Sequence, residues 1–212
     1  MKVIDRNHKD PVKIPSGTQM TPARMVKEVK AAAADWGYSS VSIGYPGPVK
    51  DNQPLLEPHN LAKGWVNFDF PKAFGKPVRI INDAAMQALG SYSGGNMLFL
   101  GLGTGLSSAL VAAGVLVPLE VAHLPYKNAG TFEQYVGVRG MKKRGKKKWR
   151  SSVADVATRL KNALNMDYVV LGGGNAKVLK KLPENMQLGA NANAFIGGFR
   201  MWEDSSSWKS KK

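Results

Sequence analysis

Apolar positions along the chain follow two different spacings, and their alternation predicts an α/β protein. Apolar residues recur at helical spacing over 21–36, after a Thr-Pro pair that is typical of a helix start. The other predicted elements are helices over 84–92, 152–164 and 193–202, strands over 39–44, 78–81, 97–100 and 168–171, and a hairpin over 108–117. The loops that follow the strands should lie at carboxyl ends, where open α/β sheets bind ligands.

Two details of the pattern concern local structure. The pair Gly197-Gly198 in the last predicted helix would allow another element to approach closely. A basic run precedes the helix predicted to begin at Ser152, and the sequence GGGN at 172–175 is expected to open onto a further helix.

Composition narrows the protein class. The chain has 212 residues, 43% of them hydrophobic, which is enough to bury a core in one large domain or two small lobes. There is no cysteine, so disulfides and Cys-based zinc sites are excluded and a reducing compartment is favoured. No apolar run reaches the length of a signal peptide or a membrane span, and we expect a soluble, cytoplasmic protein without a membrane partner.

The charge is strongly positive, with 30 Lys and Arg against 15 Asp and Glu, a formal net charge of +15. Much of it is concentrated in two segments: Lys142, Lys143, Arg144, Lys146, Lys147, Lys148 and Arg150, and the tail residues Lys209, Lys211 and Lys212. Clustering favours a polyanionic partner such as nucleic acid, an anionic membrane surface, or an inorganic or nucleotide phosphate. The alternative is that the charge serves solubility alone.

Two glycine-rich loops could bind phosphate. The first is GLGTG, in which Gly103, Thr104 and Gly105 offer unobstructed backbone N–H groups and one hydroxyl. The second is GGGN, made by Gly172, Gly173, Gly174 and Asn175. Neither matches the Walker pattern. GLGTG could equally be the start of a hairpin, and GGGN could equally be a tight strand-to-helix turn.

Polar side chains at two further places suggest acid–base or sugar chemistry. Asp83 follows a predicted strand, where it could be the general base of phosphoryl transfer to an alcohol or simply a helix cap, and Asn82 beside it could bind a sugar hydroxyl. Glu120 and His123 are spaced to share one side of a helical turn, and with Glu133 they could bind a metal or sugar hydroxyls. Three His and no Cys in the whole chain disfavour zinc.

In this order, the segments resemble the ROK family of repressors and sugar kinases, and within it the polyphosphate glucokinase branch. The resemblance spans 13–202 and rests on SIGYPGPV (42–49), EPHNLAKGWVNFDF (57–70), INDAAMQALGSY (81–92), LFLGLGTGLSSAL (98–110), PLEVAHLPY (118–126), TFEQYVGVRG (131–140), GKKKWR (145–150), VVLGGGN (169–175) and NANAFIGGFRMWE (191–203).

The resemblance implies a role for each motif. Asp83 would be the catalytic base that deprotonates the 6-hydroxyl of glucose. The other sugar-binding residues would be Gly47, Asn82, Glu120, His123 and Glu133. GLGTG would be a phosphate loop, and GGGN would face the adenosine of ATP or the equivalent part of polyphosphate. Lys146, Lys147, Lys148 and Arg150 would then form a polyphosphate track, because clustered cations bind a chain of phosphates as they bind a nucleic-acid backbone.

The resemblance also implies an actin-like, ribonuclease H-like ATPase fold with two lobes. We expect an N-terminal lobe over 1–82 completed by a helix at 192–204, a C-terminal lobe over 83–191, and a basic tail at 205–212. Residues 1–17 correspond to the segment after the family's first strand and DxGxT-type phosphate loop, so we expect that strand and loop to be missing from this chain. Relatives are often dimers, so a homodimer is a family expectation.

The function implied is transfer of a phosphoryl group from polyphosphate or ATP to glucose, with Mg²⁺ accompanying the donor and no resident metal. The alternative is a truncated, impaired pseudoenzyme that binds glucose without efficient turnover. A third hypothesis, nucleic-acid binding, rests on charge alone: Trp149 is the single aromatic within the basic run, and no RNA-binding signature is present. We therefore expect no nucleic-acid partner.

Overall fold

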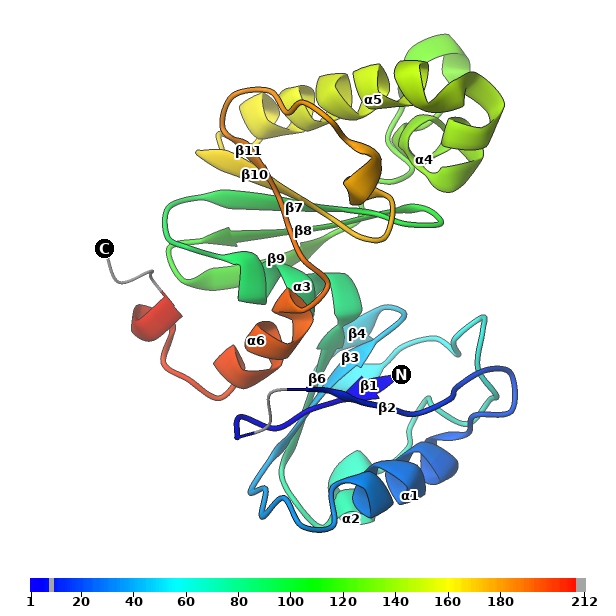
Figure 1. Ribbon diagram of the computed structural model, residues 1–212, viewed down its shortest axis with the longest axis vertical. Coiled ribbons are helices and arrows are strands. Elements are labelled where there is room, and N and C mark those ends of the chain that lie inside the picture. Colours follow the sequence, from blue (N-terminus) through cyan, green and yellow to red (C-terminus); the bar gives the residue numbers. More distant parts are fainter. Residues whose placement is uncertain (8–9, 209–212) are drawn as a thin grey trace. The chain divides into compact units, whose positions relative to one another are not determined.

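The computed structural model describes residues 1–7 and 10–208 (Figure 1). His8 and the tail residues Lys209, Lys211 and Lys212 lie outside the described residues. The chain divides into two compact units, Met1–Asp83 and the part from Ala84 onward. The boundary lies next to the expected one at residue 82, but the helix expected to complete the first lobe groups with the second unit.

The first unit contains a parallel strand pair flanked by short elements. Its elements are β1 (Lys2–Val3), β2 (Val12–Lys13), α1 (Pro22–Ala32), β3 (Val41–Tyr45), β4 (Val49–Lys50), β5 (Gln53–Pro54), α2 (Phe70–Phe74) and β6 (Val78–Asn82). β3 and β6 pair in parallel, with Tyr45 opposite Asn82 at their carboxyl ends. β1–β2 and β4–β5 are antiparallel hairpins. α1 begins as predicted, with Thr21 Oγ1 accepting from Arg24 N at 3.2 Å.

The turn of the β4–β5 hairpin is bonded to the edge of β6 through one side chain. Asn52 donates from Nδ2 to Val78 O at 2.9 Å and accepts at Oδ1 from Ile80 N at 2.6 Å. Its amide thereby satisfies backbone groups that another strand would otherwise pair. The core beneath this pair includes Tyr45, Trp65 and Phe70, which are almost completely buried.

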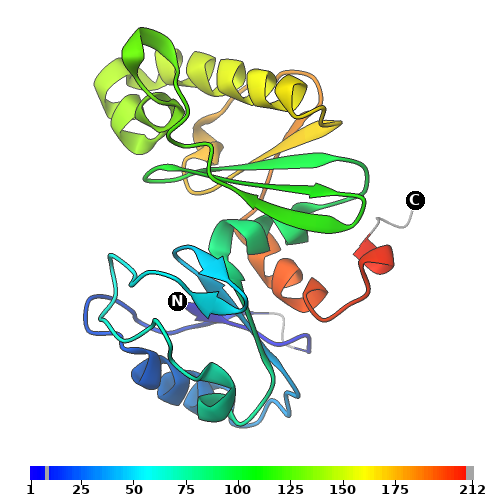
Figure 2. The same cartoon turned by 180° about the vertical axis from the view of Figure 1, so that it is seen from behind.

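The second unit is built around a five-stranded mixed sheet (Figure 2). Its strands are β7 (Met97–Leu102), β8 (Leu106–Ala112), β9 (Val115–Leu119), β10 (Tyr168–Gly172) and β11 (Met186–Leu188). Their order is β11-β10-β7-β8-β9, with β10 parallel to both of its neighbours and β7, β8 and β9 antiparallel. Every residue of β7 is buried because both faces of the sheet are covered.

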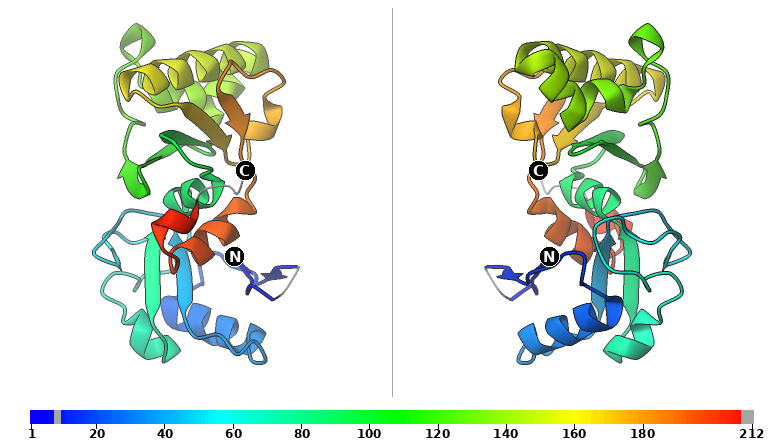
Figure 3. Two further views of the ribbon diagram at one scale, coloured as in Figure 1. Left: turned by 90° about the vertical axis from the view of Figure 1, so that its left-hand side faces the viewer. Right: turned by 90° about the vertical axis from the view of Figure 1, so that its right-hand side faces the viewer.

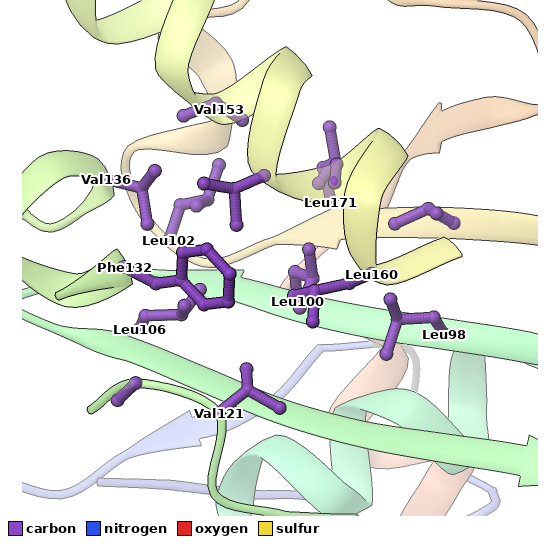
Figure 4. Close-up of a cluster of buried hydrophobic side chains, with 14 of the residues drawn as sticks. Leu98, Leu100, Leu102, Leu106, Val121, Phe132, Val136, Val153, Leu160 and Leu171 are labelled. Carbon is purple, nitrogen blue, oxygen red and sulfur yellow. The ribbon is translucent and has the colours of Figure 1, made fainter. Parts of the chain in front are cut away.

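A long helix covers one face of this sheet (Figure 4). The helices of the second unit are α3 (Asp83–Ser91), α4 (Phe132–Val136), α5 (Val138–Ala163) and α6 (Asn193–Arg200), with 3₁₀ turns η1 (Lys127–Ala129), η2 (Ala176–Val178) and η3 (Ser205–Trp208). Val153 and Leu160 of α5 pack with Leu98 and Leu100 of β7 and with Leu171 of β10. This burial accounts for the nearly continuous apolar sequences of β7 and β10.

Two predicted helices differ from those observed. The helix expected at 152–164 begins at Val138, so the basic run is helical, with an interruption at Gly145 where φ is 75°. The helix expected after GGGN is only the short η2. The run of Lys and Arg carries little apolar periodicity, which is why the first part of α5 was not predicted.

The other face of the sheet is covered by α3 and α6, which approach very closely (Figure 3). A Cβ on Gly197 would overlap the carbonyl oxygen of Met86, and one on Gly90 would overlap that of Asn193. This confirms the expectation of close packing at the glycine pair. Arg200 caps α3, donating to Leu89 O and Tyr92 O at 2.7 Å each. Among the described residues, no helix has the length and apolar character needed to cross a membrane.

Candidate functional site

The candidate residues of the first unit meet at the carboxyl ends of β3 and β6. Asn82 donates from Nδ2 to the carbonyl of Gly47 at 3.0 Å, so two of the predicted residues are in direct contact. Asp83 follows as the first residue of α3, with an exposed side chain. A carboxylate in that first turn interacts favourably with the helix dipole, so its position suits both a catalytic base and a helix-stabilising residue.

Glu57, for which no role was expected, organises the neighbouring loop through its carboxylate. It accepts from the backbone N–H groups of Gly64, Trp65 and Val66 at 3.0, 3.1 and 3.3 Å. These bonds, that of Trp65 first, lower the pKa of Glu57. No local sequence pattern predicts these hydrogen bonds, because they span seven to nine residues of irregular chain.

The ring of Tyr45 is fixed against the same loop. Its hydroxyl donates to Leu56 O at 2.7 Å, and burial followed by the charge of Glu57 raises the pKa of Tyr45 to about 12. A Cβ on Gly47 would lie 2.9 Å from the Tyr45 ring, so a larger residue would displace the ring. Gly47 is therefore needed for packing at this strand end, independently of any ligand.

The two glycine loops of the second unit lie side by side. Asn175 donates from its backbone N to Leu102 O at 3.0 Å and from Nδ2 to Gly103 O at 2.9 Å. Gly173 has φ of 82°, and its Cβ position is 2.7 Å from Leu102 O, so only glycine fits there. The structure thus places the GLGTG and GGGN loops, which are predicted from separate motifs, next to each other.

In the turn between β7 and β8 (residues 103–105), the backbone carbonyls are hydrogen-bonded to other described residues but two N–H groups are not. The carbonyl of Thr104 accepts from Val138 N at 3.2 Å, and those of Leu102 and Gly103 are taken by Asn175. Within the described part of the chain, the N–H groups of Thr104 and Gly105 have no acceptor. Occupied carbonyls beside free N–H groups make a turn suited to an anion.

Space is available next to these donors. A Cβ built on Gly103 or on Gly174 would meet no atom within 4 Å, and the side chain of Thr104 is exposed. The predicted phosphate-loop residues therefore border an open region of the second unit.

The polar group Glu120, His123 and Glu133 is arranged differently from the expectation. Glu120 and His123 lie in an irregular turn, not in a helix, and both are exposed. Glu133 is in the first turn of α4, and its N–H donates to Ala122 O at 3.0 Å. Its carboxylate Oε2 accepts from Leu106 N at 3.2 Å, so this residue contacts the β7–β8 turn directly.

The segment that carries Glu120 and His123 is attached to α5 by a cluster that the sequence did not reveal. Tyr126 donates its hydroxyl to Asp155 Oδ2 at 2.5 Å, and Lys127 and Arg159 lie 3.3 and 3.1 Å from the same carboxylate. The bond from Tyr126, followed by those from Arg159 and Lys127, lowers the pKa of Asp155. Burial raises the pKa of Tyr126.

The basic run separates into exposed lysines and anchored arginines. Lys146, Lys147 and Lys148 are exposed on α5 directly after Gly145. Arg150 instead donates from Nε to Val178 O at 2.9 Å, beside the GGGN loop. Arg144 donates to Tyr135 O at 2.5 Å and lies over the Tyr135 ring at 4.3 Å. Both arginines therefore have structural contacts.

Comparison with known proteins gives a consistent set of relatives. Residues 3–117 match the profile of the ROK family. The polyphosphate glucokinase of Mycobacterium tuberculosis (strain CDC 1551 / Oshkosh) is 26% identical over 187 residues, covering 81% of this chain and 70% of that protein. The polyphosphate glucokinase of Mycobacterium leprae (strain TN) is 24% identical over 180 residues, covering 78% and 55%.

Solved structures show the same fold. The inorganic polyphosphate/ATP-glucomannokinase from Arthrobacter sp. strain KM superposes with a TM-score of 0.70 at 20% identity, covering 92% of this chain and 90% of that one. A ROK family glucokinase from Streptomyces griseus, in complex with glucose and AMPPNP, gives 0.59 at 18% identity, covering 89% of each. The expected α/β fold of the actin-like type is confirmed.

Proposed function

The chain belongs to the ROK family, and from this premise we propose that it is a sugar kinase transferring a phosphoryl group from polyphosphate or ATP to the 6-hydroxyl of glucose. The observation that carries the proposal is the pairing of the two glycine loops through Asn175, beside a turn whose Thr104 and Gly105 N–H groups remain available. Phosphoryl transfer depends mainly on positioning and charge stabilisation, which such donors supply.

On the acceptor side, we propose Asp83 as the base. Its carboxylate would accept the proton of the 6-hydroxyl as the oxygen attacks the terminal phosphorus of the donor. The bond from that phosphorus to the bridging oxygen breaks in the same step, and ADP or a polyphosphate shortened by one unit leaves. Asn82 would bind a neighbouring hydroxyl. The bond from Asn82 Nδ2 to Gly47 O fixes the orientation of that amide and supports this role. Glu120, His123 and Glu133 are proposed as further ligands of the sugar hydroxyls.

On the donor side, the two glycine loops would bind the phosphates, and Lys146, Lys147 and Lys148 would bind the distal part of a polyphosphate chain. Their exposure suits a flexible polyanion held mainly by charge. Arg150 would act indirectly, because its guanidinium is bonded to Val178 O. The similarity to polyphosphate glucokinases supports polyphosphate as one donor.

Magnesium is proposed to accompany the donor. Mg²⁺ usually keeps several waters and binds one or two carboxylates together with substrate phosphates. Among the described residues, no group of three or more His, Cys, Asp or Glu is placed so that it could hold a metal ion. Because Asp83 is proposed as the base, the oxygen ligands of the ion would come mainly from the donor phosphates and water. When bound, the ion would neutralise charge on the transferred group.

A coupled assay for glucose 6-phosphate tests the proposal, with polyphosphate and ATP offered separately in the presence of Mg²⁺. We expect turnover with at least one donor, and Asp83→Asn to lower it by roughly a hundredfold or more while glucose affinity stays within several-fold. Glucose binding without turnover would support the pseudoenzyme alternative. Equal loss of binding and turnover in the variant would make Asp83 structural.

A further inference from the structure

Within the second unit, Glu133 contacts both the segment that carries Glu120 and His123 and the β7–β8 turn. Its backbone N–H donates to Ala122 O, in the segment that carries Glu120 and His123. Its carboxylate reaches the other way and accepts from Leu106 N at 3.2 Å, at the base of the β7–β8 turn. A Cβ placed on Gly105 would overlap Oε2 of Glu133, so the carboxylate lies directly against that glycine.

The position of this carboxylate creates an electrostatic conflict. The N–H groups of Thr104 and Gly105 favour an anion, but the negative charge of Glu133 beside Gly105 opposes a phosphate there. The side chain is half-buried, so water screens it only in part. The charge therefore weakens donor binding unless another group binds the carboxylate.

Sugar hydroxyls are such groups. A hydroxyl that donates to a carboxylate offsets part of its charge, and the carboxylate has acceptor sites beyond the one used by Leu106. We propose that Glu133 couples the two substrates: it fixes the β7–β8 turn through Leu106 and keeps donor affinity low until sugar hydroxyls bind its carboxylate. This inference rests on the proposed function, because it assumes that sugar and phosphate bind on either side of Glu133.

Two substitutions separate the charge from the hydrogen bond. Glu133→Gln removes the charge but keeps a carbonyl oxygen that can accept from Leu106 N. Glu133→Ala removes both. Glu120→Gln is a matched control, because Glu120 is a proposed sugar ligand that is exposed in the segment directly after β9.

The decisive measurement is the affinity for tripolyphosphate by calorimetry, with and without glucose and with and without Mg²⁺, at fixed ionic strength. In the unmodified protein we expect glucose to tighten tripolyphosphate binding by about fivefold to tenfold. Glu133→Gln should bind it more tightly by a similar factor without glucose and lose the response to glucose. Glu120→Gln should keep the unmodified affinity for tripolyphosphate alone and bind glucose more weakly.

Three results would overturn the inference. Unchanged or weaker tripolyphosphate binding by Glu133→Gln without glucose would show that the charge does not oppose the donor. A full glucose response in that variant would place the coupling elsewhere. Weaker binding seen only with Mg²⁺ would make Glu133 a metal ligand instead.

Hydrogen exchange in the ligand-free protein tests the bond to Leu106 separately. The amide of Leu106 should exchange faster in Glu133→Ala and stay protected in Glu133→Gln and Glu120→Gln. Equal protection in all three would refute the positioning role. If glucose tightens tripolyphosphate binding but the enzyme assay shows no glucose 6-phosphate, the proposed kinase function is refuted and the role of Glu133 stands. If glucose 6-phosphate forms but the two ligands bind independently, the kinase function stands and the role of Glu133 is refuted.

Discussion

The side-chain amide of Asn175 donates to the carbonyl of Gly103 at 2.9 Å, joining two loops that are 72 residues apart in the sequence. The backbone N–H of the same residue donates to Leu102 O at 3.0 Å. One residue thus fixes the direction of the successive carbonyls of Leu102 and Gly103, next to the N–H groups of Thr104 and Gly105 that have no acceptor among the described residues. Asn175 is proposed as a phosphate or nucleotide ligand, and these contacts indicate that it also positions the loops.

Asn175→Ala should therefore impair donor binding more than sugar binding. Loss of the bond leaves the carbonyl of Gly103 without its partner, and we expect a loss of stability of about 1–2 kcal/mol. The KM for either donor should rise by roughly tenfold or more, while glucose affinity changes less than twofold. Steady-state kinetics and urea unfolding measure both effects. Asn162→Ala, at an exposed position of α5, is the matched control; equal effects of the two changes would refute the role of Asn175.

Replacement of Lys146, Lys147 and Lys148 by Ala should weaken the use of polyphosphate more than that of ATP. A long polyanion gains affinity from each exposed cation near its path, and that gain falls with salt. We expect the KM for polyphosphate to rise by about tenfold, with a shallower salt dependence, and the KM for ATP to change by less than threefold.

A control for this triple variant removes the same charge elsewhere. Lys27, Lys72 and Lys76 are exposed in the first unit, and their replacement by Ala should leave the ratio of the two KM values unchanged. If both triple variants shift the ratio equally, the effect arises from net charge, and the lysines after Gly145 are not a specific track.

Arg150→Gln should behave differently from the lysine variants. The bond from Arg150 to Val178 O attaches α5 to the segment after the GGGN loop, so its loss should affect polyphosphate and ATP alike. We expect a similar rise in KM for both donors and a melting temperature lower by about 2–4 °C. If only the KM for polyphosphate rose, Arg150 would be a direct ligand of polyphosphate, as Lys146, Lys147 and Lys148 are proposed to be.

The sequence predicted the elements of the sheet well because their signals are local. The apolar runs at 97–100 and 168–171 lie in β7 and β10, and the glycine loops follow them. The bonds that organise the candidate site have no such signal. Glu133 to Leu106, Arg150 to Val178 and Asn175 to Gly103 span 27, 28 and 72 residues. They depend on how the fold brings together two segments that are distant in the sequence, and the spacing of residue types does not reveal this.

The same distinction explains the first part of α5. Lys and Arg are good helix formers, but a run of them shows no apolar face, and Gly145 interrupts it. Trp149 packs into the core there: it is completely buried, and Nε1 donates to Val136 O at 2.7 Å. That contact fixes the helix immediately after the three exposed lysines.

The last prediction concerns Asp155 and the pH dependence of stability. Its pKa is lowered in the folded protein, mainly by the bond from Tyr126. A group with a depressed folded pKa contributes stability that is complete above its unfolded pKa, near 3.9, and is lost as pH falls through the folded value. Asp155→Asn should therefore melt about 2–4 °C lower than the unmodified protein at pH 7.

That difference should shrink as pH falls below about 4, because protonation of Asp155 then weakens the same contacts in the unmodified protein. Thermal unfolding between pH 3 and 8 measures it. Tyr126→Phe, which removes only the hydroxyl, should show a similar loss at pH 7. Because the cluster attaches the segment of Glu120 and His123 to α5, both variants should also raise the KM for glucose more than that for the donor. A pH-independent difference would mean that Asp155 stabilises the protein through packing, without a contribution from its charge.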